Sequence, residues 1–130
     1  MKQNKDICII IVEDNIFYQQ LIAKQLESIS SNIHFFTNGE ECINKLDSLK
    51  PDIIILDNNL EGIMSGLDTL KVIRIAEPYI HVILFSSELK LNTTENLSFY
   101  GVFEYLEKNS SGFKKLKDRI LEIQPLIVDC

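Results

Sequence analysis

The sequence lacks the features that mark three broad classes of protein. Its longest continuous apolar run is Ile7–Val12, far short of the roughly 20 residues that a membrane-spanning helix needs. Basic residues are the minority, with 13 Lys and Arg against 19 Asp and Glu. The resulting net charge of −6 argues against direct nucleic-acid binding, which depends on a basic surface. The first residues also lack the apolar stretch and small-residue cleavage site of a signal peptide.

Cysteine is scarce as well. Cys8, Cys42 and Cys130 form an odd set without C-x-x-C spacing. Because Cys8 lies inside an apolar run and Cys42 on a predicted helix, we expect buried, unreactive thiols. This pattern fits a reducing compartment, and the expected location is the cytoplasm.

The composition that remains is that of a globular protein. Of the 130 residues, 45% are hydrophobic and 25% are charged, as in ordinary folded domains. No internal repeat, low-complexity tract or linker interrupts the chain. We therefore expect residues 1–130 to form a single domain.

Short apolar runs alternate with helical patterns along the whole chain. The expected strands are Ile7–Val12, Ile33–Phe36, Ile53–Leu56, Ile80–Phe85 and Val102–Leu106. Four of these runs are too continuously apolar for strands with one solvated face, so they indicate a parallel sheet covered on both sides. The expected first residues of the five helices are Asn15, Asn38, Ser65, Thr93 or Thr94, and Ser110 or Ser111. The prediction is an α/β fold, a doubly wound five-stranded parallel sheet.

Polar residues stand at the carboxyl ends of four of the expected strands. Glu13 and Asp14 follow the first, Asp57 follows the third, Ser86 ends the fourth and Lys108 lies just past the fifth. Ligands of open α/β sheets bind beyond the carboxyl ends of the strands, near the point where the strand order reverses. These side chains should therefore meet at one edge of the sheet.

Three carboxylates in one place need compensating positive charge. At a separation of about 4 Å and an effective dielectric near 20, each like-charge pair costs about 4 kcal/mol. Lys108 supplies one positive charge, and a divalent cation is the natural remainder. Mg²⁺ fits because it prefers oxygen ligands and keeps water molecules that a phosphate can displace. With the charge offset, one carboxylate could act as a nucleophile on phosphorus, and Lys108 and Ser86 could stabilise the phosphoryl oxygens.

Each of these residues alone also has an ordinary structural explanation. An acidic pair at a strand end is often a solvated turn, and Asp57 could cap a helix. Ser86 could be a turn residue and Lys108 a surface lysine. The functional interpretation depends on their joint occurrence at the ends of neighbouring strands.

On the segments IIIVEDN, IIILDNNL, VILFSS and GVFEYLEK, the sequence resembles the receiver domains of response regulators of two-component systems, the bacterial chemotaxis receiver among them. The resemblance implies a flavodoxin-like sheet of strand order 2-1-3-4-5. It implies that Asp57 is the phosphoacceptor, assisted by Lys108 and Ser86. It also implies Mg²⁺ as cofactor, bound by Glu13, Asp14, Asp57 and the backbone carbonyl of Asn59.

The same resemblance implies a mode of signalling. A sensor histidine kinase or phosphotransfer protein would supply the phosphoryl group, and Ser86 and Tyr105 would switch position on phosphorylation. A downstream protein would then bind the surface of the fourth helix, fifth strand and fifth helix. The domain would not be an enzyme beyond promoting its own phosphotransfer and dephosphorylation. Only Leu126–Cys130 follow Pro125, which leaves open a stand-alone receiver or a piece of a longer protein.

The resemblance also implies that two side chains set how long the phosphoryl group lasts. They are Asn59, two residues after the phosphoacceptor, and Glu88, two residues after Ser86. Both are polar and lack bulk, so they could orient an attacking water molecule. We expect a lifetime of seconds to minutes.

The sequence departs from the family pattern at several positions. Glu61 stands where the family usually has Pro, and Gly66 comes one residue late, which predicts a one-residue insertion within 58–65. The family's Lys-Pro pair is Lys108-Asn109, for which a trans peptide bond is the thermodynamic default.

Two other functions remain as alternatives. An aspartyl-phosphate phosphohydrolase also places Asp after an apolar strand, but it normally has a second acid where this chain has Asn59. A phosphorylation-independent pseudo-receiver would act purely as a binding module, but such a module is expected to lose the acidic pair, the aspartate or the lysine.

Overall fold

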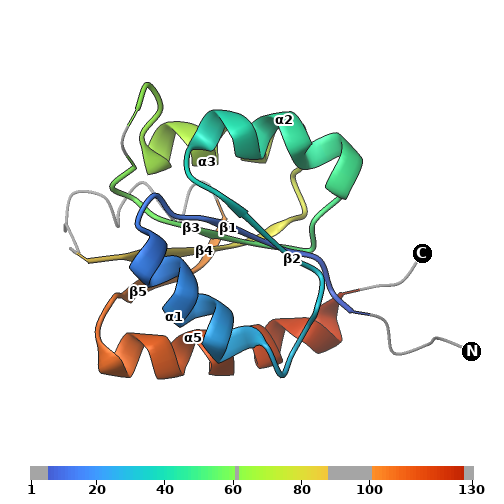
Figure 1. Cartoon of the computed structure of the whole chain (residues 1–130). Helices are drawn as coiled ribbons and strands as arrows, with labels where there is room; N and C mark the ends of the chain where they lie inside the picture. The colour runs from blue at the N-terminus through green and yellow to red at the C-terminus, as the bar shows by residue number, and fades with distance from the viewer. Residues whose placement is uncertain (1–5, 61, 88–100, 128–130) are drawn as a thin grey trace, which may run out of the picture.

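A five-stranded parallel sheet forms the centre of the protein in the computed structural model, which describes residues 6–60, 62–87 and 101–127. The strand order is β2-β1-β3-β4-β5, as the resemblance implies (Figure 1). The strands are β1 (Ile9–Val12), β2 (Ile33–Phe36), β3 (Ile53–Leu56), β4 (His81–Ser86) and β5 (Val102–Glu107). Their bounds differ from the expected ones by at most two residues, and β1 begins later because the Cys8 amide donates to the Asp52 side chain at 2.8 Å.

Helices cover both faces of this sheet. They are α1 (Ile16–Leu26), α2 (Gly39–Leu49), α3 (Gly66–Ala76) and α5 (Ser110–Ile123), followed by the short 3₁₀ turn η2 (Gln124–Leu126). Figure 1 shows α2 and α3 on one face and α1 and α5 on the other. The expected fourth helix at Thr93 or Thr94 lies outside the described residues.

The alternation of side chains along the strands divides the core into two clusters. Ile9 and Ile11 of β1 pack with the buried residues of α1 and α5. Ile10 and Val12 pack with those of α2 and α3. Every residue of β1 and β3 is buried, which confirms the prediction of strands covered on both faces.

Side-chain caps fix where the helices begin. Asn15 accepts hydrogen bonds from the amides of Phe17 and Tyr18, and Asn38 accepts one from the amide of Glu41. Ser65 forms a full capping box with Asp68. Each cap satisfies an amide that has no partner within the helix.

The last helix begins at Ser110, one of the two residues expected to open it, but the sequence did not identify its N-cap. Its N-cap is Asn109, whose side chain accepts a hydrogen bond from the Gly112 amide at 2.7 Å, rather than Ser110 or Ser111. Asn109 has the extended backbone that an N-cap needs, whereas Ser110 is already helical. The described residues contain no cis peptide bond, so the Lys108–Asn109 bond is trans as predicted.

The expectation for the cysteines is met at the two that are described. Cys8 and Cys42 are buried free thiols, and burial raises the pKa of Cys42 to about 12. Cys130 lies outside the described residues. In the described part of the chain, no helix is long and apolar enough to cross a membrane.

Candidate functional site

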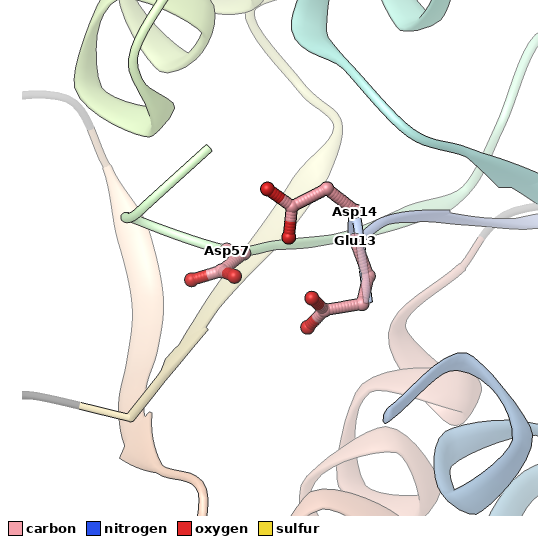
Figure 2. Close-up of side chains that lie close together, drawn as sticks. All are labelled: Glu13, Asp14 and Asp57. Atoms are coloured by element: carbon pink, nitrogen blue, oxygen red, sulfur yellow. The ribbon is translucent and has the colours of Figure 1, made fainter. Parts of the chain in front are cut away.

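The register of the sheet brings the acidic residues together. Val12 and Leu56 are partners in neighbouring parallel strands, so the residues that follow them leave the sheet side by side. The amide of Asp57 donates to the Val12 carbonyl at 3.1 Å. Glu13, Asp14 and Asp57 each present a carboxylate oxygen, and these oxygens lie within 4.8 Å of one another. Figure 2 shows the three side chains around one shared space.

The acidic pocket, as we call Glu13, Asp14 and Asp57, is largely removed from solvent. Glu13 is 1% exposed and Asp57 5%, whereas Asp14 is half-buried. Charges are seldom buried in this way without a partner, because desolvation costs several kcal/mol per ion. The arrangement therefore needs a counter-charge within the fold.

Lys108 supplies that counter-charge from the loop after β5. Its ammonium Nζ lies 2.9 Å from Asp57 Oδ2 and also contacts Glu13 Oε1, and the side chain is 3% exposed. Burial alone would lower the pKa of Lys108, but hydrogen bonds and charge attraction from Glu13 and Asp57 raise it. The ammonium is therefore held in its charged form.

The pKa of Glu13 is also raised, which for a carboxyl group favours the neutral form. Burial, with a further contribution from the negative charge of Asp57, raises the pKa of Glu13 to about 7, although Lys108 and the Asn15 amide act to lower it. One lysine does not fully compensate this pair of buried acids. A bound cation would favour the ionised form of Glu13.

Ser86 and Asn59 lie on the other side of Asp57. The amide of Asn59 donates to Asp57 Oδ1 at 3.0 Å, and its side-chain Nδ2 donates to Ser86 Oγ at 3.2 Å. Ser86 ends β4 and is fully buried. The side chain of Asn59 is thus directed toward the pocket even though an insertion was expected in the loop that follows it.

The proposed switch residues share one side of the sheet. Tyr105 of β5 is the register partner of Leu84 and packs against the cluster beneath α2 and α3. Ser86 follows Leu84 by two residues in the same strand, so it faces the same way. Glu88, the second residue expected to tune dephosphorylation, lies outside the described residues.

Sequence reasoning missed two residues of α1 that touch the site. The ring of Tyr18 lies against the Lys108 ammonium, 4.3 Å from ring centroid to Nζ. Gln19 donates from Nε2 to the carbonyl of Glu13 at 2.6 Å. Their only signal is position, because α1 starts directly after the acidic pair and its first turn must lie beside the pocket.

The chemistry of the donor atoms fits a hard divalent cation. The three acids of the pocket offer carboxylate oxygens, and Asp14 is half-buried whereas Glu13 and Asp57 are buried. Such a donor set suits Mg²⁺ or Mn²⁺ rather than a metal that prefers thiolate or imidazole ligands.

Comparison with known proteins gives consistent results. The family model for the response regulator receiver domain matches residues 9–121. The chain is 32% identical over 123 residues to a protein-glutamate methylesterase/protein-glutamine glutaminase of Clostridium acetobutylicum, and 33% identical over 129 residues to one of Bacillus subtilis. Each alignment covers 89% of this chain but only 35% and 34% of the relatives. The chain thus spans about a third of the length of these curated relatives.

Solved structures show the same architecture. The response regulator domain of Thermotoga maritima CheB has a TM-score of 0.73 and 27% identity, over 97% of this chain and 100% of that one. The isolated receiver domain of RcsB from Salmonella enterica, solved with a phosphomimetic, has a TM-score of 0.82 at 19% identity, over 93% of this chain and 90% of that one.

Proposed function

The chain belongs to the response regulator receiver domain family, and we propose that it works as a phosphorylation-dependent signalling switch with Asp57 as phosphoacceptor. One observation carries the proposal: Asp57 has one oxygen on the Lys108 ammonium and the other on the amide of Asn59, and the Asn59 side chain also reaches the Ser86 hydroxyl. Glu13 is likewise held between Lys108 and the Asn15 amide, but Asn59 connects Asp57 to Ser86. The Asp57 carboxylate is held by donors on both sides, beside two further acids that repel unneutralised charge.

The phosphotransfer step follows from this arrangement. An oxygen of Asp57 forms a bond to phosphorus while the bond between phosphorus and the donor group breaks, and the electron pair leaves with the donor. The Lys108 ammonium then pairs with the new phosphoryl oxygens, and the Ser86 hydroxyl can donate to one of them. Glu13 and Asp14, with Asp57 and the Asn59 carbonyl, would hold Mg²⁺, which supplies positive charge to the phosphoryl group.

A kinase partner is implied by membership of the family. We propose that this partner is a histidine kinase or phosphotransfer protein carrying phosphohistidine. Output would follow from a population shift in which Ser86 and Tyr105 repack and change the surface of β5 and α5. The fourth helix, the remaining part of the proposed output surface, lies outside the described residues.

Phosphorylation by a small donor tests the proposal. The protein is incubated with Mg²⁺ and acetyl phosphate, and its intact mass is measured. We expect one added phosphoryl group in the wild type and none in Asp57→Asn. Asp47→Asn, which alters an exposed aspartate of α2, is the matched control and should be phosphorylated normally.

Two results would contradict the proposal. Phosphorylation of Asp57→Asn would show that the acceptor is another residue. A wild type that takes up no phosphoryl group would favour the pseudo-receiver, and steady turnover of phosphate esters would favour the phosphohydrolase.

A further inference from the structure

The Lys108 ammonium makes one contact that has no role in the phosphotransfer step described above. The Lys108 ammonium lies over the face of the Tyr18 ring, 4.3 Å from its centroid. Two carboxylates already contact the same ammonium. An ammonium carries three N–H donors, and the ring is a third neighbour beside the carboxylates of Glu13 and Asp57.

The ring is itself fixed by further aromatic packing. Tyr18 stacks on Phe113 of α5, with centroids 6.3 Å apart and planes 18° from parallel. Phe113 in turn meets Phe85 of β4 edge-on at 4.9 Å. Tyr18 is thus held by ring contacts that do not involve the lysine.

A contact between the ammonium and a ring face has a different effect from an ion pair with a third carboxylate. An aromatic face attracts a cation through its quadrupole, and the attraction is strongest where water is excluded. The Lys108 side chain is 3% exposed, so the condition is met. Unlike a carboxylate, the ring adds no negative charge that would repel an incoming phosphoryl group.

We propose that Tyr18 is a positioning residue for phosphotransfer, which holds the Lys108 ammonium through its ring face while the anion paired with that ammonium changes from the Asp57 carboxylate to the phosphoryl group. The inference rests on the proposed function of Asp57. Its structural part, the contact between ring and ammonium, can be tested in the unphosphorylated protein.

The first measurement is spectroscopic. A ring face this close to the ammonium shifts the NMR resonances of the Lys108 ammonium protons upfield. We expect the shift in the wild type and in Tyr18→Phe, which keeps the ring, and its loss in Tyr18→Leu. If the Lys108 ammonium protons have the same chemical shift in the wild type and in Tyr18→Leu, the proposal is overturned, whether or not Asp57 accepts a phosphoryl group.

The second measurement is the rate of phosphorylation by acetyl phosphate with Mg²⁺. Because the ring contact is desolvated, we expect Tyr18→Leu to slow the reaction about fivefold to tenfold, with Tyr18→Phe within about twofold of the wild type. Tyr79→Leu makes the same change at a tyrosine that is 90% exposed, and it should leave the rate unchanged.

The pattern across the variants decides the proposal. If Tyr18→Phe is as slow as Tyr18→Leu, or if Tyr18→Leu is as fast as the wild type, the ring face does not position Lys108. Should Tyr18→Leu fold poorly, replacement of Tyr18 by a trifluorophenylalanine keeps the ring and weakens its quadrupole, and an unchanged rate then overturns the proposal. If the wild type takes up no phosphoryl group, the proposed function fails, and the NMR result alone decides the structural part.

Discussion

At the scale of single residues, each hydrogen-bond donor of the site serves more than one acceptor. One ammonium contacts two buried carboxylates, and Asn59 serves both Asp57 and Ser86. Each donor therefore has more than one role, and a substitution at either residue should affect more than one contact of the site.

Asn59 provides a prediction about how long the phosphoryl group lasts. Its side chain lies at Ser86 Oγ, 3.2 Å away, where it could orient a water molecule toward phosphorus. We expect a wild-type lifetime of seconds to minutes. Because about one oriented hydrogen bond is lost, Asn59→Met should lengthen it about threefold to tenfold, and more in combination with Glu88→Leu.

The measurement is release of inorganic phosphate after the donor is removed. Asn44→Met, an exposed change on α2, is the matched control and should keep the wild-type lifetime. An hours-long lifetime in the wild type, or equal lifetimes in Asn59→Met and the control, would contradict the assignment.

At the scale of elements, the strands and the helix caps were readable from the sequence for different reasons. The runs that became β1 and β3 are buried on both faces, so their composition alone identified them. Asn38 and Ser65 were identified by the acid three residues later, which completes the cap. Asn109 was missed because serines follow it directly, and only its backbone conformation distinguishes it from them.

Some residues of the candidate site could be predicted from the sequence and others could not. Glu13, Asp57 and Lys108 could be predicted because each ends or follows a strand, and topology brings such ends together. Tyr18 could not, because its role depends on which way the first turn of α1 faces across to β5. That direction is a product of packing between elements and leaves no pattern in the local sequence.

The loop between β3 and α3 gives a prediction at this scale. A Cβ added to Gly66 would lie 2.6 Å from the Cα of Asn58 and nearer still to the Asp57 carbonyl oxygen. Gly66→Ala should therefore push the start of α3 away from the phosphoacceptor and lower the free energy of unfolding by about 1–3 kcal/mol.

Chemical denaturation measures this loss, and phosphorylation by acetyl phosphate should slow in the same variant. Ser65→Ala is the matched control, because it removes the adjacent cap without crowding Asp57 and should cost stability of about 0.5–2 kcal/mol with little change in rate. A Gly66→Ala protein that phosphorylates at the wild-type rate would show that the close approach does not position Asp57.

At the scale of the whole molecule, the same charged side chains affect both the stability of the fold and its function. The two core clusters hold β1 and β3 rigidly side by side, and this rigidity forces the acids that follow them into one pocket. The fold therefore carries a repulsion among Glu13, Asp14 and Asp57 that Lys108 only partly offsets, as the raised pKa of Glu13 indicates.

The repulsion among these three acids predicts that wild type and Asp14→Asn exchange their order of thermal stability as Mg²⁺ is added. A cation that binds only the folded state stabilises it by about 2.7 kcal/mol at one hundred times its dissociation constant, so the melting temperature of the wild type should rise with Mg²⁺ and fall with a chelator. Asp14→Asn removes one repelling charge and one ligand together. It should melt above the wild type in chelator, because the repulsion is smaller, and below it in high Mg²⁺, because the site is weakened.

Asp47→Asn, distant from the pocket, should follow the wild-type curve throughout. Thermal unfolding across a Mg²⁺ series decides the matter. Curves for Asp14→Asn and wild type that stay parallel would mean that Asp14 is not a ligand, and a wild-type melting temperature that does not change with Mg²⁺ would mean that the acidic pocket does not bind the metal.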